Sequence, residues 1–360
     1  MTAGAAPTPD KITATPARVA LALLIGSLGG AAAQAADLPL AWMIGAMLAT
    51  TLAAALGLPI AMWLGLRATM VTVLGVMLGS AFSPEILDRL LEWALSLACL
   101  VVYAGVSGVL CLQAFARLAR FDPVTAYFSA MPGGLAEMTL VGGAMGGDER
   151  VISLIHASRL LIVILCLPFA FQLLAGYDPA LRPDAGDSLM AIGGADLTIL
   201  VACGALGYFG ARALGIPAAP VVGPMVLSAI VHLAGLTAAR PPSELIAAAQ
   251  VIVGSAIGCR FAGISRAFVQ RAVAAALGGT AIHLGTTLAF AGLLAAATGL
   301  DFEALVLAYS PGGLAEMSLI ALALGSDAAF VATHHIFRIF TIVVLAPAAF
   351  RLLRRRNHAE

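Results

Sequence analysis

The chain has 360 residues, of which 61% are hydrophobic and 11% are charged, and its formal net charge at pH 7 is zero. A soluble domain carries about 25% charged residues, so this composition excludes an ordinary globular protein and indicates an integral membrane protein. Most arginines lie at the ends of apolar segments, which excludes a basic face for a nucleic acid.

Apolar stretches long enough to enter or cross a bilayer core of about 30 Å follow one another without an intervening soluble domain. They cover residues 18–36, 39–57, 67–82, 92–116, 122–147, 150–175, 192–212, 216–238, 246–263, 272–298, 302–325 and 328–350. The first stretch ends in "AAAQAAD", as a signal peptide with an A-x-A cleavage site does. Because it has a counterpart at 197–217, we expect a retained first helix.

Two copies of "PGGLAEM", at 132–138 and 311–317, reveal an internal duplication. Sliding the second copy back by 179 positions (311 minus 132) also superimposes further residues without a gap. These pairs are Asp122 and Asp301, Asp148 and Asp327, His156 and His335, Arg159 and Arg338, and Pro168 and Pro347. We therefore predict five parts: a cytoplasmic N-terminal tail 1–17, repeat one 18–175, a polar linker 176–191, repeat two 192–350 and a basic C-terminal tail 351–360.

The number of crossings in each repeat decides whether the two halves are parallel or inverted. Six crossings make them parallel and put the arginines of the second half opposite the basic C-terminal tail, against the positive-inside rule. If the PGG segment dips in and returns, each half crosses five times, and fourteen Lys and Arg residues lie on the cytoplasmic side against three outside. If segment 67–82 is instead the one that does not cross, ten Lys and Arg residues lie on the cytoplasmic side and seven lie outside, which fits the positive-inside rule less well.

The charge distribution therefore predicts an all-α protein of the bacterial inner membrane, with about ten transmembrane helices in a 5+5 inverted repeat. Two broken or re-entrant PGG segments complete it, and both termini are cytoplasmic. A re-entrant hairpin and a crossing broken helix remain alternatives for these segments.

The PGG motifs fall near the membrane midplane. The ten residues from Asp122 to Met131 span about 15 Å of helix, half the thickness of the hydrocarbon core. Proline removes a backbone donor and the glycines relax the dihedral angles, so one half-helix ends and another begins. Glu137 and Glu316 then lie in a first helical turn, where a carboxylate complements the helix dipole. They either cap their own helices or line a site for a cation or proton. Ionisable residues at this depth in a membrane are usually functional, which favours the second role.

An arginine follows each motif at a similar depth. Ion pairs between Glu137 and Arg159, and between Glu316 and Arg338, would neutralise charges that the bilayer disfavours. An arginine at the end of a half-helix is also a receptor for an anionic substrate. The predicted substrate or ion site comprises Pro132, Gly133, Gly134, Glu137, His156, Arg159, Pro311, Gly312, Gly313, Glu316, His335 and Arg338.

The histidines differ in how strongly the pattern singles them out. His156 and His335 lie three residues before the arginines, on the same helix face, and can change charge near neutral pH. The sequence leaves two alternatives for these histidines: they take part in proton coupling, or they stay neutral and hydrogen-bonded. His334 has no counterpart in the other half and is a weaker candidate, and for the unrepeated His232 and His283 we expect structural roles.

Three further patterns predict local structure. Asp148 and Asp327 precede crossings and are expected to be N-caps. Gly75-x-x-x-Gly79 and Gly254-x-x-x-Gly258 permit close helix approach and are expected to pack inside the bundle rather than form a dimer face. The five cysteines form no CxxC pair and are expected to be small buried hydrophobes, not disulfides or zinc ligands.

The doubled P-G-G-L-A-E-M with its trailing H-x-x-R resembles the AbrB family of bacterial membrane proteins, over about residues 18–350. The resemblance implies the labels given to that family, regulator of gene expression and putative ammonia monooxygenase. Oxygen chemistry requires clustered metal ligands, and the only adjacent histidines, His334 and His335, point about 100° apart on a helix. We therefore expect no enzyme activity, no metal and no cofactor.

Inverted repeats with interrupted helices meeting near the midplane are typical of secondary transporters. The sequence thus predicts transport of a small solute or ion, with a small carboxylate, an amino acid, an ammonium-like cation and a proton-coupled neutral solute all open as substrates. The alternative is a membrane-embedded regulator. The expected partners are the lipid bilayer and the solute, with no nucleic acid, and a homodimer is left open.

Overall fold

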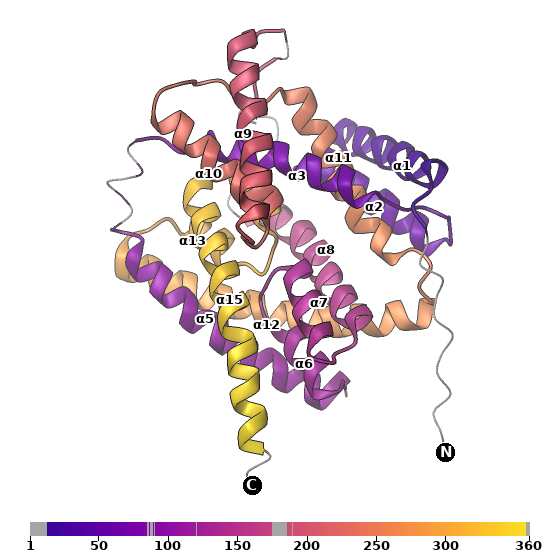
Figure 1. Cartoon of the computed structure of the whole chain (residues 1–360). Coiled ribbons are helices and arrows are strands. Elements are labelled where there is room, and N and C mark those ends of the chain that lie inside the picture. The colour runs from indigo at the N-terminus through magenta and orange to yellow at the C-terminus, as the bar shows by residue number, and fades with distance from the viewer. Residues whose placement is uncertain are drawn as a thin grey trace.

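The computed structural model describes residues 13–84, 86, 89, 91–119, 121–174, 186–188 and 190–357, in which all regular secondary structure is helical (Figure 1). The first half contains α1 (Pro16–Ala35), α2 (Ala41–Ala55), α3 (Leu64–Gly79), α5 (Ala94–Ala114), the π-helical turn η1 (Phe115–Ala119), α6 (Pro123–Ala130), α7 (Leu135–Ala144) and α8 (Glu149–Leu174). The second half contains α9 (Gly194–Ala213), α10 (Ala219–Leu233), α11 (Ser243–Gly258), the 3-10 turn η3 (Cys259–Phe261), α12 (Arg266–Thr298), α13 (Phe302–Tyr309), α14 (Leu314–Ala323) and α15 (Ala328–Asn357). The predicted N-terminal tail and linker lie largely outside the described residues, whereas α15 continues through residues 351–357 of the predicted C-terminal tail.

The helices of the two halves follow the same order, as the duplicated sequence predicts. The helices α3, α6 and α7 begin and end 179 positions before α11, α13 and α14. The predicted N-caps are also present, because Asp148 accepts from the backbone N–H of Val151 and Asp327 accepts from that of Phe330. The same local sequence therefore produces the same local structure twice.

The two halves are interleaved through small residues. Helix α3 packs on α10 of the other half, and α11 packs on α2. A Cβ at Gly75 would lie 2.7 Å from the carbonyl oxygen of Val221, and one at Gly254 would collide with the carbonyl oxygen of Met43. Because no larger side chain fits between these backbones, the GxxxG positions are packing positions inside the bundle, as predicted.

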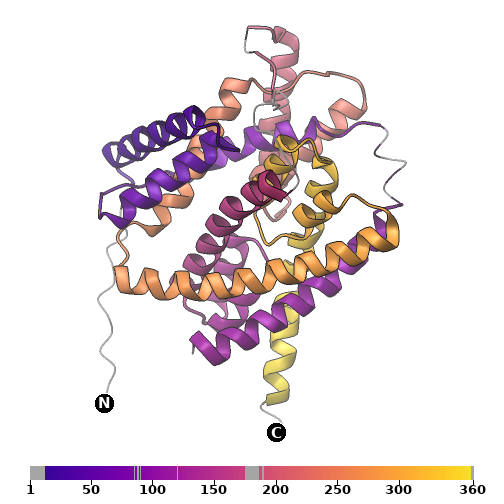
Figure 2. The ribbon, with the colours of Figure 1, turned by 180° about the vertical axis from the view of Figure 1, so that it is seen from behind.

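A second group of helices surrounds the two PGG motifs. Helices α5 and α12 run side by side across one face of the molecule (Figure 2), and α8 packs against α12. The short helices α6 and α7 pack against α8, and α13 and α14 pack against α15. This arrangement places the end of every interrupted helix against the helix that carries the following arginine.

The helices are long and apolar enough for a membrane protein. Within the described residues seven helices could cross a bilayer by length and composition, and five further apolar helices are shorter. Large apolar side chains such as Leu28 on α1 and Phe209 on α9 are exposed, which fits contact with lipid. The chain is therefore a multi-pass membrane protein.

The cysteines only partly follow the prediction. All five are free thiols; Cys111 and Cys203 are buried, and Cys99 and Cys259 are half-buried. Cys166 is exposed on α8, so the expectation of burial is wrong for it. An apolar surface in lipid tolerates a small thiol as readily as a protein interior does.

Candidate functional site

Both PGG motifs interrupt a helix. In the first half, Asp122 caps α6 by accepting from the backbone N–H groups of Val124 and Thr125, and α6 ends at Ala130. Helix α7 begins at Leu135, with Gly134 in an extended N-cap conformation. The equivalent break separates α13 from α14 in the second half. Each break therefore leaves the carbonyls of one half-helix and the N–H groups of the next without helical partners.

Arg159 satisfies the carbonyl end of the first break. Its Nη1 donates to the carbonyl oxygen of Met131 at 3.0 Å, and its Nη2 donates to that of Gly133 at 2.7 Å. The guanidinium thus lies at the negative end of the α6 dipole. Its position on α8, which packs against both α6 and α7, ties the two half-helices together.

Arg338 repeats this arrangement in the second half with more contacts. Its Nη1 donates to the carbonyl oxygen of Ser310 at 2.6 Å, and its Nη2 donates to that of Gly312 at 2.9 Å. Its Nη2 also lies 2.8 Å from Nδ1 of His335. Arg338 is therefore the more tightly held of the two arginines.

The glutamate–arginine pairs predicted from the sequence are wrong. Within the described chain, the ion pairs join Arg89 to Glu92 and to Asp327. The carbonyl oxygens exposed by each break lie closer to the guanidinium than any carboxylate. Helix dipoles, rather than opposite side-chain charges, therefore compensate the buried arginines in part.

The histidines hold the same half-helix ends. His156 Nε2 lies 2.9 Å from the carbonyl oxygen of Phe128, and His335 Nε2 lies 3.0 Å from that of Leu307. Both rings are fully buried. Since a ring nitrogen must carry a proton to donate to a carbonyl, the bond fixes which nitrogen is protonated in the neutral form.

The glutamates cover the N-termini of the second half-helices. A Cβ added at Gly134 would collide with Oε2 of Glu137, and one at Gly313 would collide with Oε2 of Glu316. Each carboxylate therefore folds back over its own N-cap glycine, at the positive end of the dipole. Glu316 is only 5% exposed and Glu137 is half-buried.

Comparison with known proteins decides the family. The model of the family described as "Transition state regulatory protein AbrB" matches residues 42–354. The chain belongs to the AbrB family. Its relatives include "Uncharacterized protein YhjN" of Bacillus subtilis (strain 168), 26% identical over 301 residues, covering 78% of this chain and 77% of the relative. "Putative regulator AbrB" of Escherichia coli (strain K12) is 25% identical over 333 residues, covering 89% and 91%.

The structure of this AbrB-family protein brings two further helices to the site. Tyr103 of α5 and Thr287 of α12 are fully buried, and their hydroxyl oxygens lie 3.0 Å apart. His283, also on α12, lies within electrostatic range of both arginines. Sequence reasoning missed Tyr103 and Thr287 and expected only a structural role for His283, because the duplication places Ile282 opposite Tyr103 and Ala104 opposite His283.

A buried aromatic cluster adjoins the second break of the AbrB-family chain. His334 Nε2 lies 2.7 Å from the hydroxyl of Ser96, and its Nδ1 lies 2.8 Å from the carbonyl oxygen of Phe330. Its ring packs against Phe330 with centroids 4.0 Å apart, and Trp93 and Tyr309 surround it. The first half has isoleucine where His334 lies, so this cluster, to which Trp93 and Ser96 of the first half also contribute, forms at the second break and not at the first.

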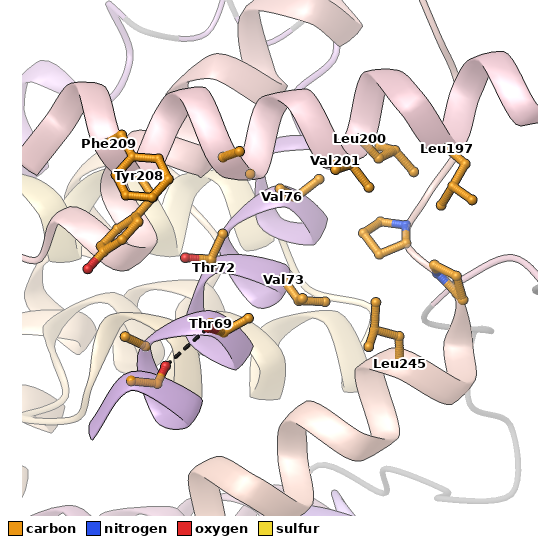
Figure 3. A pocket seen from close by; sticks show the side chains of 16 residues that line it. Thr69, Thr72, Val73, Val76, Leu197, Leu200, Val201, Tyr208, Phe209 and Leu245 are labelled. Atoms are coloured by element: carbon orange, nitrogen blue, oxygen red, sulfur yellow. Dashed lines mark hydrogen bonds between the residues drawn. The ribbon is translucent and has the colours of Figure 1, made fainter. Parts of the chain in front are cut away.

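A cavity of about 480 Å³ lies elsewhere, between α3, α9 and the start of α11 (Figure 3). Its lining is largely apolar, with Val76, Leu200 and Phe209 among the side chains. The hydroxyl of Thr72 already donates to the carbonyl oxygen of Pro220 at 3.0 Å. The cavity contains none of the predicted site residues, and its apolar walls suit a hydrocarbon rather than a charged solute.

Within the described residues, no group of three or more His, Cys, Asp or Glu side chains is placed to hold a metal ion.

Proposed function

We propose that this AbrB-family protein is a secondary transporter of a small polar solute or ion, with its site between the two PGG breaks. The observation that supports this proposal most strongly is the repeated break itself. Each break combines an arginine held on free carbonyls with a glutamate over a free helix N-terminus. Interrupted helices that meet inside an apolar bundle are the usual construction of solute sites in secondary transporters. In this proposal the solute crosses the bilayer unchanged.

Flux measurements test the transport proposal. The double variant Glu137→Gln and Glu316→Gln should insert into membranes normally but abolish flux in proteoliposomes, since both carboxylates at the breaks lose their charge. Glu244→Gln is the matched control, because Glu244 also lies in a first helical turn but is exposed on α11. Flux that depends on neither glutamate nor on Arg159 and Arg338 would contradict the proposal.

We also propose the 5+5 inverted arrangement in the bacterial inner membrane, with both termini in the cytoplasm. Met145 and Leu324 are matched positions at the C-caps of α7 and α14, and both are half-buried. Cysteines introduced there, in a background without the native cysteines, should react with a membrane-impermeant maleimide from opposite sides. Reaction of both from one side would remove the inversion.

The second candidate function is regulation of gene expression, which the name of the Escherichia coli relative, "Putative regulator AbrB", favours. A regulator predicts that deletion of the gene changes transcript levels while proteoliposomes show no flux. Flux without a change in transcripts would exclude this second function.

A further inference from the structure

The centre of the molecule contains two arginines without a carboxylate partner. Arg159 and Arg338 are each 3% exposed. Neither takes part in an ion pair within the described chain. The two guanidiniums lie within electrostatic range of each other, so each also experiences the repulsion of a like charge. Such a cluster requires compensation from another source.

The half-helix dipoles supply only part of this compensation. The C-terminal ends of α6 and α13 each carry about half a negative charge. Against the two full positive charges of the arginines, these two ends leave about one positive charge where the guanidiniums lie, while Glu137 and Glu316 lie over the positive N-terminal ends of α7 and α14. A buried charge without a partner is strongly disfavoured in a membrane, and one singly charged anion would offset it.

Unused hydrogen-bond donors point to the same conclusion. The Nε atoms of Arg159 and Arg338 are buried and have no hydrogen-bond partner in the described chain. An arginine has five N–H donors, and the carbonyl bonds described above occupy Nη1 and Nη2. The Nε edge of a guanidinium binds the two oxygens of a carboxylate side by side, which gives carboxylates an advantage over spherical anions.

Two neighbouring helices add hydroxyl groups. The hydroxyl of Ser107 on α5 is buried close to that of Tyr103, one helical turn earlier. The hydroxyls of Tyr103 and Thr287 lie 3.0 Å apart, and that of Thr287 also lies 3.4 Å from the carbonyl oxygen of Tyr309. When Thr287 donates to Tyr103, the proton of the Tyr103 hydroxyl is free for a further acceptor. Tyr103 lies within electrostatic range of both arginines. Helices α5, α8, α12 and α15 thus all present polar groups to one buried centre.

From these contacts we propose that the centre between Arg159 and Arg338 binds a small organic anion through its carboxylate group. The inference rests on the proposed transport function and names its substrate class. A free cation is excluded from this centre by the two guanidiniums. Glu137 and Glu316 lie over the N-termini of α7 and α14, where an accompanying proton or cation would bind.

Thermal unfolding of the purified full-length protein in detergent tests the assignment. Acetate, benzoate and succinate should raise the unfolding temperature in a saturable manner at constant ionic strength, whereas chloride and ammonium should not. Tyr103→Phe leaves the arginine–carbonyl bonds in place and should weaken carboxylate binding by about tenfold, the loss of one hydrogen bond to a charged group. Tyr208→Phe, in the apolar cavity, is the control and should leave binding unchanged.

The outcomes separate this inference from the proposed function. Stabilisation by ammonium, by chloride alone or by none of the three carboxylates would overturn the assignment, while glutamate-dependent flux of another solute would preserve transport. Carboxylate binding that depends on Tyr103, without flux of any bound carboxylate, would support the site and overturn transport. Equal effects of Tyr103→Phe and Tyr208→Phe would overturn the assignment to this centre.

Discussion

Helices α7 and α14 share the motif LAEM after the same break, yet they occupy different surroundings. Leu140 on α7 is 73% exposed, whereas Leu319 at the matching position of α14 is 2% exposed. Both helices pack against the preceding half-helix (α6 or α13), α8 and α15, and α14 also packs against α3. The motif therefore determines the break and the position of the glutamate, and the neighbouring helices determine the burial.

The contacts inside each break and the packing around it therefore have to be compared separately. Within each break, the arginine and the histidine bind matching carbonyl oxygens and the glutamate covers the matching glycine, and Arg338 alone also contacts its histidine. Around the break, one half is open and the other is enclosed. For a transporter built from two equivalent halves, such asymmetry is the expected form of a single state, because only one side of the site opens at a time.

Replacing the arginines should have the largest effect on stability. Arg338→Gln leaves the buried carbonyls of Ser310 and Gly312 without donors, and removing one partner of a buried charged contact costs about 3–5 kcal/mol. Arg159→Gln should cost about 2–3 kcal/mol, because the more open first break allows water to replace some bonds. Unfolding in detergent measures both, with the exposed Arg351→Gln as the control. Equal losses for Arg159 and Arg338 would contradict the difference between the halves.

A methyl group at the N-cap glycines should give the next largest effect. Gly313→Ala drives a Cβ into the carboxylate of Glu316, which is buried, so we expect a loss of about 1–3 kcal/mol from overpacking. Glu137 can turn outward, so Gly134→Ala should cost less than about 1 kcal/mol.

The control for these alanine substitutions is Gly278→Ala in α12, where no atom lies near the added Cβ. It should stabilise the helix slightly, because glycine is the poorer helix former. If Gly134→Ala proved as damaging as Gly313→Ala, the carboxylate of Glu137 would be as tightly enclosed as that of Glu316.

Features encoded by neighbouring residues could be predicted from the sequence. The duplication, both breaks, the caps formed by Asp148 and Asp327 and the glycine packing positions all follow from local pattern. The inverted topology rests on charge counting and stays a prediction. The family was also predicted correctly, from the doubled motif and the residues that trail it.

Long-range contacts could not be predicted in the same way. The arginines bind carbonyls instead of glutamates because the break itself exposes acceptors, which a count of charged side chains omits. Tyr103 and His283 reach the centre through the crossing of α5 and α12, and neither belongs to a repeated motif. The unequal burial of Glu137 and Glu316 depends on where α3 lies, and two nearly identical sequences cannot encode that difference.

The smallest predicted effect concerns an ion pair that joins the two halves and involves Asp327 but not the matching Asp148. Arg89 Nη1 lies 3.0 Å from Oδ2 of Asp327, with side chains 48% and 22% exposed, and the matching Asp148 has no such partner in the described chain. Arg89→Gln removes this pair but keeps the N-cap bond of Asp327 to Phe330. We expect a loss of no more than about 1 kcal/mol. Unfolding at low and high salt should show the loss only at low salt, because salt screens exposed charges. A loss that persisted at high salt would mean that Arg89 stabilises the enclosed half by packing, and the asymmetry would then extend to the segment between α3 and α5.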